Sequence, residues 1–188
     1  MSTPPVAITG IGLVSALGLD AVIANPTYMI GPYDAKLSSG RFVWTIARGK
    51  LPGLVPGANN FVDVRDVARG MALAAEKGRA GERYILGGVN LPFTDFVARV
   101  ARLAGVKPPQ WRVPWAGAVA LGWLGDLQEA VLRREPLVNS VTVRYGFCKT
   151  FIFSSEKAQR ELGYRVSPLD DAIAACLAWF REHGLLRQ

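Results

Sequence analysis

Tyr145 and Lys149 are the two residues of this 188-residue chain whose types and spacing come nearest to a catalytic pair. Residues four apart share one face of a helix, so the lysine ammonium would lower the pKa of the tyrosine and prepare it as an acid or base. The surroundings argue against this chemistry, because Gly146 is unfavourable inside a helix and residues 141–143 and 151–153 favour strand. Such a short motif also recurs by chance. We therefore assign no catalytic residue.

A second candidate is the segment Asn25-Pro26-Thr27, which follows the short apolar run 21–24. The run is typical of a buried strand. Pro26 is expected to end it, because proline cannot continue a strand ladder and biases the preceding residue toward an extended conformation. In open α/β sheets, ligands bind outside the carboxyl ends of the strands. The sequence therefore predicts a loop at residues 25–27 that forms a binding site.

The remaining chemically active residues favour structural roles. Asp63 and Asp66 lie where a helix begins, so a helix cap and a first-turn carboxylate explain both. His183 lies near the negative end of the last helix, where it favours a dipole partner over a base. Cys148 and Cys176 have no identifiable activating base and form no disulfide framework, which indicates a reducing compartment. With so few soft ligands, we expect no metal site.

Composition limits the class of protein. The length of 188 residues predicts one domain over residues 1–188, and a hydrophobic half of the residues excludes a disordered chain. The net charge is +7, but the basic residues are scattered without a run of five, which favours a solvated surface over a nucleic-acid partner. No apolar run reaches the roughly 18 residues of a spanning helix, and no signal-peptide pattern opens the chain. We expect a cytoplasmic protein without a membrane span.

Periodicity predicts an α/β fold with few strands and several packed helices. The predicted strands are 21–24, 61–64 and 84–86. Helices are expected within 35–53, from Asp66 to Gly78, from Thr94 to Gly105, within 115–134, and at the end of the chain. For the last helix we expect Ser167 as the cap, Pro168 in the first position and Asp170 completing a capping box.

Four segments carry a resemblance to a known family, in the family's order. They are Asn25-Pro26-Thr27 with Gly31-Pro32, residues 60–68, residues 82–88 and residues 154–164. Together they resemble the NAD-dependent epimerase/dehydratase group of extended short-chain dehydrogenases/reductases. The nearest branches are the dihydroflavonol-reductase-like proteins and the hopanoid-associated sugar epimerases. The resemblance implies an incomplete Rossmann-like sheet, with residues 20–188 as the carboxyl-terminal, substrate-binding half and residues 1–19 as an atypical strand-turn start.

The same resemblance implies a function. The family uses NAD or NADP to epimerise, dehydrate or reduce sugars or small carbonyl and alcohol substrates, and Asn25, Pro26 and Thr27 match positions that lie along the nicotinamide. In the family, about 140 residues lie between the first glycine turn and this loop, and they hold the catalytic Tyr-x-x-x-Lys. Gly18 is here followed almost directly by the late strand. We therefore expect a truncated chain that is inactive alone. Asn59 and Asn60 replace the Arg-Asp pair common in sugar-nucleotide epimerases, which favours the reductase-like branch.

The first strand and its glycine turn leave two interpretations open. Residues 6–18 resemble the start of β-ketoacyl synthases, although no Cys/His/His set follows. Alternatively, Thr9-Gly10-x-Gly12 is a worn dinucleotide-binding turn without its third glycine and its acidic partner. We favour a structural strand or a joining scar. The alternative function is a non-catalytic interaction module, either a homo-oligomer or bound to a partner that completes the sheet, since unpaired strand edges invite pairing.

Overall fold

The computed structural model describes residues 6–9, 21–132, 138–148 and 150–186. They form two compact units. Unit 1 comprises residues 1–44, 60–90 and 153–188, and unit 2 comprises residues 45–59 and 91–152. The chain passes between the units inside three elements, α1 (Gly40–Ala47), β4 (Ala58–Asp63) and β6 (Val89–Pro92). The single domain expected from chain length stays a prediction.

A parallel sheet of three strands organises unit 1. Its order is β1 (Val6–Thr9), β2 (Ala21–Pro26) and β5 (Arg83–Leu86), with β2 in the centre. The first four residues of β2 are buried, as expected of a strand paired on both sides. The strand expected at the start of residues 6–18 is confirmed at Val6–Thr9, whereas the glycine turn after it lies outside the described residues. The α/β fold class is also confirmed.

The predicted loop at residues 25–27 is wrong. Strand β2 continues through Asn25 to Pro26, and after Thr27 alone the chain enters β3 (Tyr28–Ile30) of a second sheet, ordered β3-β4-β6. The physical reason is strand alternation. The backbone N–H groups of Ile23 and Thr27 point to β5 and bond Glu82 and Leu86, so the nitrogen of Pro26 faces the other edge. On that edge the last pair with β1 is Thr9 with Ala24, so among the described residues the proline removes no ladder bond.

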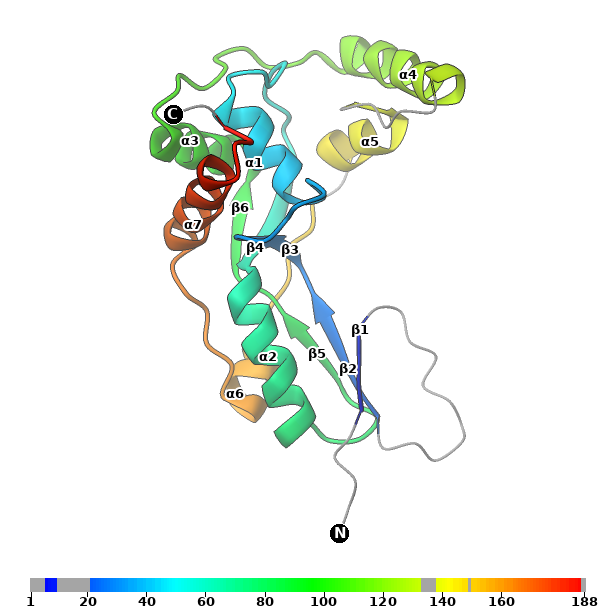
Figure 1. Cartoon of the computed structure of the whole chain (residues 1–188). Helices are drawn as coiled ribbons and strands as arrows, with labels where there is room; N and C mark the ends of the chain where they lie inside the picture. Colours follow the sequence, from blue (N-terminus) through cyan, green and yellow to red (C-terminus); the bar gives the residue numbers. More distant parts are fainter. Residues whose placement is uncertain (1–5, 10–20, 133–137, 149, 187–188) are drawn as a thin grey trace. The chain divides into compact units, whose positions relative to one another are not determined.

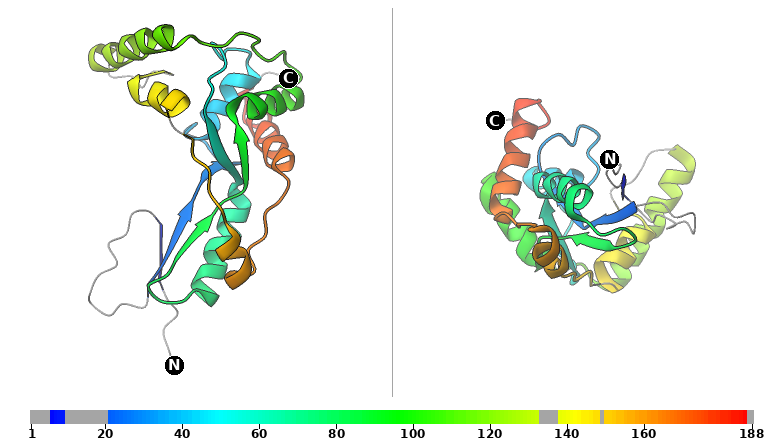
Figure 2. Two further views of the ribbon diagram at one scale, coloured as in Figure 1. Left: turned by 180° about the vertical axis from the view of Figure 1, so that it is seen from behind. Right: turned by 90° about the horizontal axis from the view of Figure 1, so that it is seen from below.

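Helices α2 (Val64–Lys77) and α6 (Glu156–Leu162) cover one face of this sheet, as Figures 1 and 2 show. Helix α2 begins two residues earlier than its sequence pattern indicated. Helices α2 and α6 form a continuous apolar core with β2 and β5. Its buried members are Val22, Ala24, Val62, Val67, Ala74, Tyr84, Leu86, Ala158, Leu162 and Tyr164.

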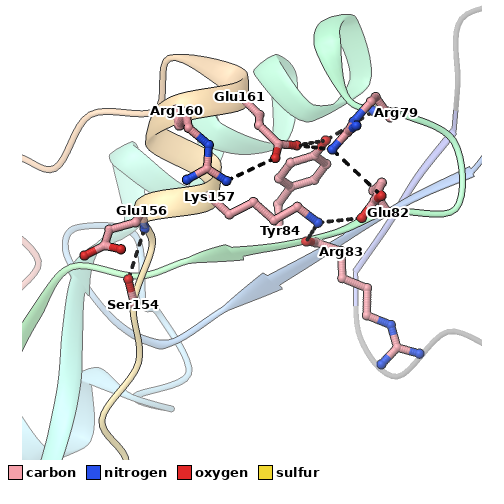
Figure 3. A network of polar contacts seen from close by, with 9 residues as sticks. All are labelled: Arg79, Glu82, Arg83, Tyr84, Ser154, Glu156, Lys157, Arg160 and Glu161. Atoms are coloured by element: carbon pink, nitrogen blue, oxygen red, sulfur yellow. Dashed lines mark hydrogen bonds and ion pairs between the residues drawn. The ribbon is translucent and has the colours of Figure 1, made fainter.

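A polar network fastens α6 to the start of β5 (Figure 3). Lys157 Nζ donates to Glu82 Oε2 at 2.5 Å and to the carbonyl of Arg83 at 3.0 Å. Glu161 Oε2 accepts from Arg79 Nη2 at 2.9 Å and from the Tyr84 hydroxyl at 3.1 Å. The network therefore holds α6 against β5 at the edge of the apolar core.

Helix α7 (Leu169–Glu182) buries one apolar face, which includes Leu169, Ile173, Cys176, Leu177 and Phe180. Its predicted cap is wrong. Pro168 occupies the cap position without a side-chain hydrogen bond, and Ser167 instead donates its hydroxyl to Asp66 at 2.8 Å. A buried carboxylate competes successfully for this hydroxyl because its lone pairs must be satisfied.

Unit 2 contains α3 (Phe93–Ala104), α4 (Trp115–Leu132) and α5 (Ser140–Cys148). The strand preference inferred for residues 141–143 is wrong, because they lie in α5. Asn139 Oδ1 accepts the N–H of Thr142 at 2.9 Å, and Thr142 Oγ1 accepts the N–H of Asn139 at 2.8 Å, which is a capping box. No helix in the described part of the chain is both long and apolar enough to cross a membrane.

Candidate functional site

The carboxyl end of β2 presents Asn25 on one face of the unit 1 sheet. Val22 and Ala24 belong to the core under α2, so alternation places Ile23 and Asn25 on the opposite face. Asn25 lies beside Ile85 in the parallel register and is half-buried. No hydrogen bond joins its side-chain amide to another residue in the described ranges. An amide at the carboxyl end of a central parallel strand is therefore available to a ligand.

Thr27 is fixed rather than free. Its hydroxyl donates to Asn60 Oδ1 at 2.7 Å, and its backbone N–H donates to the carbonyl of Leu86 at 3.4 Å. A β-branched side chain held by both bonds has little remaining freedom. Thr27 thus supports the position of Asn25 and Pro26 and fixes the direction in which the chain leaves the sheet.

Asn60 is the centre of this support. Its side chain is fully buried, and its Oδ1 also accepts the N–H of Gly88 at 2.7 Å. Its Nδ2 donates to Asn90 Oδ1 at 2.7 Å and lies 3.3 Å from the carbonyl oxygens of Gly88 and Phe153. One amide therefore joins strand β4, the segment after β5 and the segment before α6 to Thr27. A neutral amide does this without the cost of burying a charge.

Gly87 and Gly88 allow the close approach that the Asn60 bonds require. A Cβ on Gly88 would lie 2.2 Å from the carbonyl oxygen of Phe61, and a Cβ on Gly87 would lie 2.9 Å from Asn60 Oδ1. Any side chain at Gly88 would push the segment away from β4 and break the bond to Asn60. These glycines therefore serve a packing role.

The tyrosines beside this segment differ in their surroundings. Tyr33 is 78% exposed and has a positive φ of 74°. Tyr28 is turned inward instead, with its hydroxyl donating to the carbonyl of Ser39 at 3.0 Å and its ring edge-on to Phe61. Burial, followed by the charge of Asp34, raises the pKa of Tyr28 above its ordinary value. Tyr28 is therefore a poor acid or base at neutral pH.

The acidic residues at the start of α2 have the structural roles predicted for them. Asp63 caps the helix through the N–H of Arg65 at 2.8 Å and pairs with its guanidinium. Asp66 is fully buried and accepts the N–H and hydroxyl of Ser167 at 2.7 and 2.8 Å, besides pairing with Arg69. Both carboxylates are engaged in holding the fold.

Asn25, Pro26 and Thr27 lie in succession at the carboxyl end of β2, where Asn60 holds Thr27. The structure adds Asn60 and Asn90, which the sequence reasoning did not assign to the site. The available signal was an asparagine beside the apolar pair Phe61-Val62, since an amide inside a buried strand needs partners.

Tyr145 lies on α5, and Lys149 is outside the described residues. Among the described residues, no cluster of three or more potential ligands could hold a metal ion.

Comparisons with known proteins identify the family. No protein-family model matches the chain. It is 33% identical over 175 residues, 90% of its length, to a protein of Synechocystis named "Putative dihydroflavonol 4-reductase". It is also 33% identical over 177 residues, 93% of its length, to sterol demethylase protein B of Methylococcus capsulatus. The chain is related to one half of the extended short-chain dehydrogenases/reductases.

Solved structures of this dehydrogenase/reductase family agree with the assignment. A nucleoside-diphosphate-sugar epimerase from Pseudomonas aeruginosa matches 90% of the chain at 33% identity, with a TM-score of 0.73. A dTDP-glucose 4,6-dehydratase from Streptomyces venezuelae with NAD bound has the same fold over 92% of the chain, with 22% identity and a TM-score of 0.61. The resemblance stated from the four sequence segments is thereby confirmed.

The chain spans about half the length of the relatives it matches. It covers 51% and 54% of the Synechocystis and Methylococcus proteins, 51% of the epimerase chain and 47% of the dehydratase chain. Activity, substrate and cofactor belong to those whole proteins.

Proposed function

We propose that the chain supplies one wall of a nicotinamide-dinucleotide site in an NAD(P)-dependent epimerase, dehydratase or reductase. The substrate class is a sugar or a small carbonyl or alcohol compound. The observation that carries this proposal is the Asn25 amide, which has no hydrogen-bond partner among the described residues and lies at the carboxyl end of the central parallel strand.

The residues present fit one end of such a cofactor. The Asn25 amide matches the donor and acceptor pattern of a nicotinamide carboxamide, and the half-buried Ile85 beside it on the same sheet face offers apolar contact to a ring. Pro26 and Thr27 complete the wall, with Thr27 held by Asn60. When bound, nicotinamide supplies hydride acceptor or donor chemistry. The role of the chain's own residues is to bind and orient the ring.

Competition between cofactor fragments tests the proposal. In saturation-transfer NMR, we expect the nicotinamide protons of NAD to receive more saturation than the adenine protons. Nicotinamide mononucleotide should compete with NAD, whereas ADP should not. Asn25→Ala should remove the signal, while Gln128→Ala, an exposed amide on α4, should leave it unchanged. Transfer only to the adenine protons, or an unchanged signal in Asn25→Ala, would contradict the proposal.

A second candidate function is an interaction module. Within the described residues, β2 is paired on both sides, whereas β1 and β5 are each paired on one side only. An edge of this kind can pair with a second copy or a partner chain. Light scattering after size exclusion tests it, because a monomer at all accessible concentrations would rule out self-pairing.

A further inference from the structure

Helix α4 has one face covered and one face exposed. The covered face contains Ala118, Gly122 and Gly125, all buried. A Cβ on Gly125 would overlap the carbonyl oxygen of Val138, and a Cβ on Gly122 would lie 3.2 Å from Ser140, so the start of α5 approaches α4 closely here. Figures 1 and 2 show the two helices side by side. The glycines therefore mark the side of α4 that faces its own fold.

The opposite face of α4 is apolar and exposed. Trp123, Leu124, Leu127 and Val131 follow the spacing of one helical face, and 71%, 62%, 60% and 70% of their surfaces are exposed. We call these four residues the α4 stripe. No charged residue interrupts it, because Asp126 lies toward α5 and accepts the N–H of Ser140 at 3.1 Å. Four large apolar side chains in one uncharged stripe indicate a binding surface.

Charge is divided unevenly between the two units. Unit 2, which carries the α4 stripe, holds ten Lys and Arg against four Asp and Glu, a net charge of +6. Unit 1 holds twelve against eleven, a net charge of +1. Lys107, Arg112 and Arg144 are exposed on unit 2. Two copies meeting through unit 2 would bring like charges together, whereas an anionic surface would be attracted to it.

We propose that the α4 stripe docks on an anionic lipid surface, with α4 lying in the plane of the headgroups. A helix that exposes tryptophan and leucine on one face, in a strongly basic unit, offers both the apolar side chains and the positive charge that an anionic bilayer surface attracts. Tryptophan prefers this depth of the bilayer, and Trp111 and Trp115 of the same unit are also half exposed. The helix lies on the bilayer and does not cross it.

Vesicle co-sedimentation of the full chain tests the proposal. We expect binding to vesicles of phosphatidylcholine with about one third phosphatidylglycerol, weaker binding to phosphatidylcholine alone, and weakening by about 0.5 M salt. Leu124→Ser with Leu127→Ser should lower the partition coefficient at least about tenfold, because two exposed leucines no longer enter the lipid. Ile152→Ser, which removes an exposed side chain elsewhere in unit 2, should bind as the parent chain does.

Two further measurements separate lipid from protein partners. Brominated lipids should quench the fluorescence of the bound chain, and Trp123→Phe should keep binding while losing part of that quenching. Absence of sedimentation, or equal binding by the double serine variant, would overturn the proposal. It would also be overturned if the chain forms dimers that the double variant abolishes while vesicle affinity stays the same, because the stripe would then belong to a second copy. Circular dichroism checks that the variants remain folded.

Discussion

The hydroxyl of Thr27 donates a hydrogen bond to Asn60 Oδ1 at 2.7 Å across 33 residues of sequence. This bond connects the only residue between β2 and β3 to the amide that joins three other segments of unit 1. The candidate cofactor wall therefore depends on a buried polar network and not on the stiffness of a loop.

Removal of the Asn60 amide should destabilise the protein more than removal of the Thr27 hydroxyl. Asn60→Leu leaves the N–H of Gly88 and the side chains of Thr27 and Asn90 without their shared partner, which should cost about 3 kcal/mol. Thr27→Val removes one donor and should cost about 1 kcal/mol. Urea unfolding with an unchanged m value measures both. Equal losses would show that the network is not centred on Asn60.

The buried carboxylate of Asp66 should be the most sensitive acidic position near α2. Asp66→Ala leaves the N–H and hydroxyl of Ser167 and the guanidinium of Arg69 without their acceptor, for an expected loss of about 3 kcal/mol. Asp171→Ala removes an exposed first-turn carboxylate of α7 and should cost about 0.5 kcal/mol. Thermal unfolding of the two variants gives the comparison. A loss in Asp66→Ala no larger than in Asp171→Ala would refute the structural role.

These residues also show how far the sequence predicts the fold. Helices α2, α3 and α7 follow strong apolar periods and were predicted, because burial of one face dominates their formation. Helix α5 was missed because Val141 and Val143 favour strand locally, whereas the capping box of Asn139 and Thr142 starts a helix there. Local propensity is weak beside satisfied helix ends and tertiary packing.

The candidate site was located by sequence, but its support was not. Asn25, Pro26 and Thr27 could be placed near a strand end from the proline and the apolar run before it. The partners of Asn60 are up to 93 residues distant in sequence, as for the carbonyl of Phe153. Ser167 was likewise expected to cap its own helix and instead bonds Asp66, 101 residues away. Hydrogen bonds between distant segments leave no periodic signal in a sequence.

Acid should loosen the attachment of α6 to β5. The hydrogen bond from Lys157 lowers the pKa of Glu82. Burial raises the pKa of Glu161, but the hydrogen bonds from Arg79 and Tyr84 lower it by more, so the pKa of Glu161 is also lowered. A carboxylate with a lowered folded pKa stabilises the fold above its unfolded pKa of about 4.3, and this stabilisation is lost as pH falls through the folded value.

Substitution of both glutamates isolates this effect. Glu82→Gln with Glu161→Gln should flatten the fall in unfolding free energy on the acid side, measured by urea unfolding at several pH values. Glu156→Gln, in the first turn of the same helix, is the control and should keep the slope of the parent chain. An equal acid slope in the double variant would contradict the role of the network.

The Cys176 thiol should be unreactive in the folded protein. Burial raises its pKa to about 12, against an opposing backbone bond from Gly31. In a Cys148→Ser background, alkylation by iodoacetamide at pH 8 should therefore require unfolding and follow the urea transition. Because the unfolded thiol ionises near pH 8.5, the unfolding free energy should fall as pH rises from there toward 12. Rapid native alkylation would show that the thiol is accessible.

The chain alone should transfer no hydride between NAD(P)H and carbonyl substrates. A tyrosine acid needs a lysine ammonium on the same helical face, one turn later. Helix α5 ends at Cys148, and by Thr150 the chain forms an isolated parallel bridge with Ala58. The carbonyl oxygen of Gly146, which a longer helix would pair with residue 150, accepts the N–H of Gly57 at 2.8 Å. As far as the structure describes it, the helix therefore continues for three residues after Tyr145. Absorbance at 340 nm during incubation with a panel of aldehydes and ketones measures the reaction, and Tyr145→Phe is the matched variant. Turnover that Tyr145→Phe abolishes would establish Tyr145 as a catalytic residue, whereas cofactor binding without turnover is the result expected of a single wall.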